Sequence, residues 1–116
     1  MNKICTSQEQ SQKLAELGID RKTSDMYYWC GSGLRIGGYK AQEEEFDIPA
    51  WSLTALLDVL PDELEEGYYL TLFKEGKEYC CCYEDNNGDS FKHTFADNPI
   101  DACYEMILKL KELKLL

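Results

Sequence analysis

The dipeptide Asn87-Gly88 stands between two runs of residues that favour β-strands, and it constrains the fold more than any other local feature. Asn-Gly accepts the positive φ angles of a tight hairpin turn, so the two runs are predicted to form an antiparallel hairpin. With this dipeptide as the turn, the ladder places Cys82 opposite His93 and Cys80 opposite Phe95. One strand of the hairpin therefore carries the tripeptide of three consecutive cysteines.

A second hairpin is predicted just upstream, between strands at about 68–73 and 77–83, and its register decides which cysteines are buried. A two-residue loop at Glu75-Gly76 would put Cys81 on the same face as Leu70 and Leu72. A three-residue loop over 74–76 would instead put Cys80 and Cys82 on the face of these leucines. We expect the three-residue loop, because it collects more apolar side chains on one face. That face would carry Tyr68, Leu70, Leu72, Cys80, Cys82, Phe91, His93 and Phe95, and Cys81 would point outward among tyrosines.

Capping residues and prolines predict two helices before these strands. In the first helix Thr6 is the expected N-cap, Glu9 completes a capping box, and Gly18 is the expected stop. The second helix is expected to begin with Pro49 at its first helical position and to end before Pro61. Its apolar residues surround most of the circumference, so most of this helix should be buried.

A third helix is predicted at the end of the chain, with Asn98 as N-cap and Pro99 at the first helical position. At 100° per residue, its apolar side chains span an arc of roughly 220°. A helix that lies on a sheet needs an apolar arc of only about 100°. Another element or another subunit must cover the surplus, which makes Met106 and Leu113 candidates for a partner surface or a homodimer contact.

Two more strands are predicted at about 26–36, around a glycine-rich turn, and they complete the element order αββαβββα. This order predicts an α+β fold with a mainly antiparallel sheet packed by helices. The 116 residues suit one domain, expected to span 1–116.

The charge balance restricts the classes of partner. The chain has 12 lysines and arginines against 22 acidic residues, a net charge of −10. Phosphate backbones repel such a polyanion, so direct nucleic-acid binding is not expected. The acidic run Glu43, Glu44 and Glu45 could face a basic partner or contribute to mimicry of DNA. No apolar stretch is long enough to cross a membrane and no signal peptide is evident, so we expect a cytoplasmic protein without a membrane partner.

The six cysteines and the single histidine raise the question of a metal site. Cys80, Cys82 and His93 are predicted to share one sheet face and carry good zinc ligands. Their spacing differs from the paired C-x₂-C of known zinc modules, and free cysteine is among the most frequently buried residue types. We therefore predict that Cys80 and Cys82 fill the core, with no metal, no cofactor and no catalytic residue; the metal site remains the alternative.

Four segments, "ICTSQEQSQKLAELGID", "DMYYW", "IPAWSLTALLDVLP" and "ADNPIDACYEMILKL", together resemble a group of short uncharacterised proteins from prophages and mobile elements of intestinal anaerobic bacteria. The resemblance is weakest over residues 77–95. It implies a genomic context and an intracellular bacterial setting, and it transfers no functional residue.

These observations predict a small acidic accessory protein, of the kind carried by phages and mobile elements, that acts by binding another protein. DNA mimicry is a sharper form of the same hypothesis. The alternative is a small metal-binding protein or metal-dependent enzyme that uses the cysteines and the histidine. The elements of the fold and the burial of the three adjacent cysteines distinguish these possibilities.

Overall fold

The computed structural model describes residues 3–29, 33–36, 48–65 and 67–116, and it confirms the α+β class. In chain order the elements are α1 (Gln8–Glu16), the 3₁₀ helix η1 (Arg21–Thr23), β1 (Met26–Trp29), β2 (Gly33–Ile36), β3 (Ile48–Ala50), α2 (Leu53–Val59), β4 (Glu63–Leu64), β5 (Tyr68–Glu75), β6 (Glu78–Glu84), β7 (Ser90–Ala96) and α3 (Pro99–Glu112). The short elements η1, β3 and β4 were not predicted.

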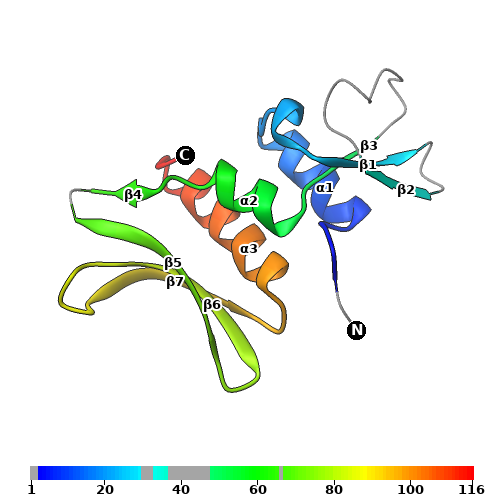
Figure 1. Cartoon of the computed structure of the whole chain (residues 1–116). Helices are drawn as coiled ribbons and strands as arrows, with labels where there is room; N and C mark the ends of the chain where they lie inside the picture. The colour runs from blue at the N-terminus through cyan, green and yellow to red at the C-terminus, as the bar shows by residue number, and fades with distance from the viewer. Residues whose placement is uncertain (1–2, 30–32, 37–47, 66) are drawn as a thin grey trace.

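The strands form two antiparallel sheets, one with the order β2-β1-β3 and one with the order β4-β5-β6-β7. Figure 1 shows α2 and α3 together on one side of the four-stranded sheet, with α1 and the three-stranded sheet beyond them. The main core lies between α3, α2 and the near face of the four-stranded sheet. The prediction of one mainly antiparallel sheet therefore holds for the strand direction, while the strands divide into two sheets.

The turn between β5 and β6 has two residues, so the three-residue loop is wrong. Glu75 pairs with Glu78, which leaves Gly76-Lys77 as the turn, and Gly76 has a φ of +62°. A glycine with positive φ at the first turn position is typical of a type II′ hairpin. In this register Leu72 pairs with Cys81. Both side chains then face the helices, because paired residues of an antiparallel ladder share one face.

The turn between β6 and β7 has three residues, one more than predicted. The backbone N–H of Asp85 donates to the carbonyl oxygen of Asp89 at 2.9 Å, so residues 86–88 form the loop. Cys80 nevertheless pairs with Phe95, as predicted. The extra loop residue is compensated by a shift of register further along the hairpin.

That shift is a β-bulge in β7. The flanking pairs are Cys81 with Thr94 and Tyr83 with Phe91. Between them β6 has only Cys82, whereas β7 has both Lys92 and His93, and Lys92 has a φ of +57°. The predicted one-to-one pairing of Cys82 with His93 is therefore wrong. A bulge changes which face the following residues occupy. Phe91 packs against the core, while His93 and Phe95 are exposed on the opposite face.

The first helix begins one residue later than predicted. Ser7 is the N-cap, and its side chain and that of Gln10 form the capping box. Thr6 has another role: its hydroxyl accepts from the backbone N–H of Trp51 at 3.1 Å and lies 2.8 Å from the hydroxyl of Ser11. The side chain of Thr6 thus ties the N-terminal segment to the start of α2.

The end of α1 agrees with the prediction. Gly18 has a φ of +86°, and the N–H of Ile19 donates to the carbonyl oxygen of Leu14 at 3.0 Å. This is the backbone bond of a Schellman motif, in which glycine takes the left-handed position.

The second helix is shorter than predicted, because Pro49 belongs to β3. Ser52 is the N-cap of α2, and its side chain accepts from the N–H of Ala55. The carboxylate of Asp25 accepts hydrogen bonds from the backbone N–H and the hydroxyl of Ser52. The preceding residues pair with β1 and stay extended. Pro61 follows the C-cap residue of the helix, as predicted.

The wide apolar arc of α3 is covered within the chain. Met106 is fully buried, so its assignment to a partner surface is wrong for the folded chain, and α2 packs against α3. Leu113, the other residue of that assignment, keeps 44% of its surface exposed.

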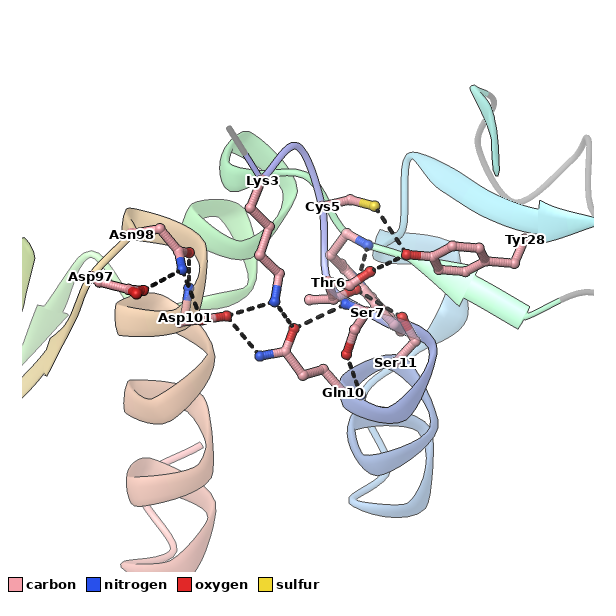
Figure 2. Close-up of polar contacts among 11 residues, drawn as sticks. Lys3, Cys5, Thr6, Ser7, Gln10, Ser11, Tyr28, Asp97, Asn98 and Asp101 are labelled. Carbon is pink, nitrogen blue, oxygen red and sulfur yellow. Dashed lines mark hydrogen bonds and ion pairs between the residues drawn. The ribbon is translucent and has the colours of Figure 1, made fainter. Parts of the chain in front are cut away.

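A polar cluster joins the two ends of the chain (Figure 2). The ammonium of Lys3 lies 2.7 Å from a carboxylate oxygen of Asp101, and the side-chain amide of Gln10 donates to the same oxygen at 2.8 Å. Asn98 donates to the other oxygen at 2.8 Å. Partial burial alone would raise the pKa of Asp101, but the bonds from Lys3, Gln10 and Asn98 hold it below its usual value.

Replacing Met106 tests its burial. Met106→Ala should lower the free energy of unfolding by about 2–5 kcal/mol, because it leaves a cavity in the core. Leu113→Ala should change it by less than about 1 kcal/mol. Chemical denaturation of both variants measures the difference, and equal effects would contradict the burial of Met106.

Replacing Asp101 tests the polar cluster. Asp101→Asn should lower the free energy of unfolding by about 1 kcal/mol at neutral pH, because Lys3 loses its ionic partner. The folded pKa of Asp101 lies below its unfolded value, so the ionised form stabilises the fold above about pH 4 and this contribution disappears on further acidification. The gap between wild type and variant should close accordingly in denaturation at stepped pH. Glu105→Gln is the control, and a pH-independent gap would refute the role of the charge.

Candidate protein-binding surface

The face of the four-stranded sheet that points away from α2 and α3 carries an unusual set of side chains. We call it the outer sheet face. The registers, together with the stacking of His93 on Phe95, place twelve residues on it: Glu63, Tyr69, Thr71, Phe73, Glu75, Glu78, Cys80, Cys82, Glu84, Ser90, His93 and Phe95. No described element covers this face in Figure 1.

Three aromatic side chains of the outer sheet face are open to solvent. Tyr69 is 48% exposed, Phe73 37% and Phe95 51%. Phe73 pairs with Cys80, which pairs with Phe95, so the two phenyl rings lie in one row across three strands. The ring of His93 stacks on Phe95 with centroids 6.1 Å apart and an interplanar angle of 6°. Exposed apolar groups that adjoin one another mark interaction sites more often than isolated ones do.

Cys80 lies between Phe73 and Phe95 in one row of the sheet, and Cys82 lies beside Thr71 in the adjacent row. Both residues have no exposed surface, although they belong to the outer sheet face. Burial raises the pKa of Cys80, and burial together with the neighbouring Cys80 and Glu84 raises the pKa of Cys82 to about 12. These thiols stay protonated at neutral pH and serve as apolar packing under the aromatic side chains.

Cys81 lies on the opposite face, so its predicted outward orientation is wrong. It is fully buried in the main core next to Cys103 on α3. The hydrogen bond with Cys103, followed by burial, raises the pKa of Cys81. The two-residue turn of the first hairpin explains this placement, because it puts the middle cysteine on the face of the leucines.

The predicted metal ligands share a face but have other partners. A ring nitrogen of His93 lies 2.6 Å from the hydroxyl of Ser90, and the thiol of Cys82 lies 3.8 Å from a carboxylate oxygen of Glu84. Within the described ranges, no group of three or more histidine, cysteine and acidic side chains could hold a metal ion. The three residues share one sheet face, as predicted, but it is the outer face, so the prediction that Cys80 and Cys82 lie on the face of Leu70 and Leu72 is wrong.

The charge of the outer sheet face has one sign. Its four glutamates form two groups, Glu63 and Glu84 on either side of Tyr69, and the paired Glu75 and Glu78 at the opposite end. No lysine or arginine is among the twelve residues that define it.

The nearby lysines are directed to other groups. The ammonium of Lys74 lies 5.5 Å from the ring centroid of Tyr79, and that of Lys92 lies 5.2 Å from the ring centroid of Phe91. Lys109 donates to the carbonyl oxygen of His93 at 3.1 Å. The four glutamates thus set the charge of the outer sheet face as it is defined here.

Two hollows lie close to these elements. One, of about 460 Å³, opens beside Phe95 and is also lined by Asp97, Asp101 and Glu105. The other, of about 510 Å³, lies between α1 and α3 and is lined by alternating lysines and glutamates with two leucines. The first adds negative charge at the margin of the outer sheet face.

The sequence prediction did not identify this surface. Phe73 was assigned to the outward face and Phe95 to the buried one, and only the two-residue loop joins them on one exposed face. The predicted partner residues Glu43, Glu44 and Glu45 lie outside the described residues.

No protein-family model matches the chain, and neither a curated protein nor a solved structure matches it. In the described part of the chain, no helix has the length and apolar character needed to cross a membrane.

Thiol labelling tests the state of the outer cysteines. With a pKa of about 12, on the order of 1 in 10,000 Cys82 thiols is ionised at pH 8. Cys80 and Cys82 should therefore react with a disulfide reagent at least about 10-fold more slowly in the native protein than in the unfolded chain. Peptide mapping by mass spectrometry after timed labelling gives the rates, and equal rates would contradict the packing role.

Proposed function

We propose that this protein is a non-enzymatic accessory protein that binds another protein through the outer sheet face. The observation that carries the proposal is the row of exposed aromatic side chains on β5 and β7, seated on two buried thiols. Aromatic side chains bury a large area at low conformational cost, which makes them frequent anchors of protein interfaces.

The chemistry of the described residues supports binding rather than catalysis. The two outer thiols have raised pKa values and are therefore poor nucleophiles. The ring of His93 is stacked on Phe95 and bonded to Ser90, both on its own strand, and no second acid–base group is bonded to it.

Direct binding of nucleic acid is not favoured either, because glutamates flank the aromatic centre and would repel phosphates. For DNA mimicry, carboxylates should follow one another at phosphate-like spacing. On the outer sheet face an aromatic centre separates the two glutamate groups, which favours an apolar contact with a protein. The resemblance to proteins of prophages and mobile elements fits an accessory role of this kind.

Truncating the aromatic side chains tests the proposal. Phe73→Ser combined with Phe95→Ser should reduce recovery of cross-linked partners from a lysate of the producing cells by at least about 10-fold, since anchor residues of an interface each contribute 2 kcal/mol or more. Quantitative mass spectrometry of pull-downs measures the recovery. Ile36→Ser combined with Leu115→Ser is the matched control, because both side chains are exposed and neither belongs to the four-stranded sheet.

The control should recover the same partners as the wild type, and denaturation curves should show that both double variants remain folded. Undiminished recovery by the Phe73/Phe95 variant would refute the proposal. So would a reproducible absence of any partner for the wild type.

A further inference from the structure

We infer that the outer sheet face receives a basic amphipathic helix of another protein, with an apolar stripe between two groups of lysine or arginine side chains. This inference rests on the proposed function and specifies the partner that the surface fits. Three properties of the face lead to it: its dimensions, its charge, and the order of its side chains along the strands.

The dimensions fit one helix. Neighbouring strands lie about 4.8 Å apart, so the axes of β5 and β7 are roughly 10 Å apart, which is close to the diameter of a helix with its side chains. The chain itself gives an example: α3, which has 14 residues, packs along β6 and β7 on the opposite face of the same sheet. A second helix on the outer side would complete a three-layer arrangement.

The order of side chains along the strands sets where the partner's charges belong. The row of Glu63, Tyr69 and Glu84 lies at one end, and the pair Glu75 and Glu78 at the other. Glu75 lies six positions after Tyr69 on β5, which is about 20 Å at 3.3 Å per residue. A helix rises 1.5 Å per residue, so basic side chains about 13 residues apart reach both groups.

The centre of the face requires apolar side chains between those charges. Phe73, Cys80 and Phe95 form the row there, with Thr71 and Cys82 in the adjacent row. The hollow beside Phe95, which Asp97 and Glu105 also line, can receive a further basic side chain. An arginine in this position can lie over the exposed ring of Phe95 while its charge meets the carboxylates.

A second copy of this chain fits the face less well. Two outer sheet faces in contact would bring eight glutamates together without a lysine or arginine between them, four from each copy. Each copy also carries a net charge of −10. Like charges brought together in an interface disfavour association. A positively charged partner turns the same glutamates into attractive groups.

Selection from a peptide library tests the inference. Phage-displayed random peptides of about 16 residues are selected on the wild-type protein and counter-selected on the Phe73→Ser/Phe95→Ser variant, which keeps every charge. The peptides that require the two phenylalanines are then sequenced and synthesised. We expect them to be enriched in lysine and arginine near both ends, to have apolar residues at i, i+3, i+4 and i+7 between, and to become helical on binding.

Charge variants provide the second measurement on the same peptides. Substituting Glu63, Glu75, Glu78 and Glu84 together by glutamine should weaken binding at least about 10-fold at low salt, and less so at high salt, because the lost attraction is electrostatic. The matched control substitutes Glu9, Glu16, Asp58 and Glu112, on α1, α2 and α3, by the corresponding amides and should change binding by no more than about 2-fold, although it removes the same net charge.

The outcomes separate this inference from the proposed function. Peptides that require the phenylalanines but show no basic enrichment, or that bind the glutamine variant and the control equally well, would overturn the inferred partner and leave protein binding at this face intact. If no peptide requires the phenylalanines and the wild type recovers no partner from lysate, both proposals fail. Self-association through the face, seen as a dimer by light scattering that the Phe73→Ser/Phe95→Ser variant lacks, would also overturn the basic-helix partner.

Discussion

The two-residue turn at Gly76-Lys77 determines which half of the β5–β6 side chains becomes core. Successive strand residues point to opposite faces, so one added or removed loop residue would exchange the buried and exposed sets. With the observed turn, Cys81 and Tyr83 meet the helices, while Cys80 and Cys82 lie on the outer sheet face. The core beneath α3 and the exposed aromatic row are thus two consequences of one backbone register.

Local signals predicted the helix ends well where one capping residue dominates. The Schellman bond after Leu14 and the start of α3 at Pro99 follow from a glycine and from an Asn-Pro pair. The same reasoning misplaced the start of α2, because Pro49 fits the first turn of a helix as readily as a sheet edge. The pairing of β3 with β1 and the hydrogen bonds of Ser52 to Asp25 place Pro49 in a strand and start the helix after Ser52. Both are contacts between residues distant in the sequence.

The outer sheet face was not predicted because the sequence favoured the wrong turn between β5 and β6, and the β6–β7 hairpin also deviates twice from the simplest ladder. The turn before β7 has one extra residue, and the bulge at Lys92 compensates for it, so the pairing of Cys80 with Phe95 agrees with a prediction that assumed neither. A lysine with positive φ is not a recognisable bulge signal in a sequence. The sequence favoured the wrong β5–β6 register because that register gathers more apolar residues on one face. Cysteine and phenylalanine on a sheet face do not show whether helices cover that face.

The polar cluster around Asp101 has a consequence for biosynthesis. Lys3 and Asp101 are separated by 98 positions, and Gln10 of α1 shares the same carboxylate. Proteins emerge from the ribosome N-terminus first, so these early residues must wait for the last helix before they obtain their ionic partner. Contacts between distant parts of a chain also slow the search for the native state. The N-terminal segment is therefore the part of the chain that stays incompletely anchored for longest during translation.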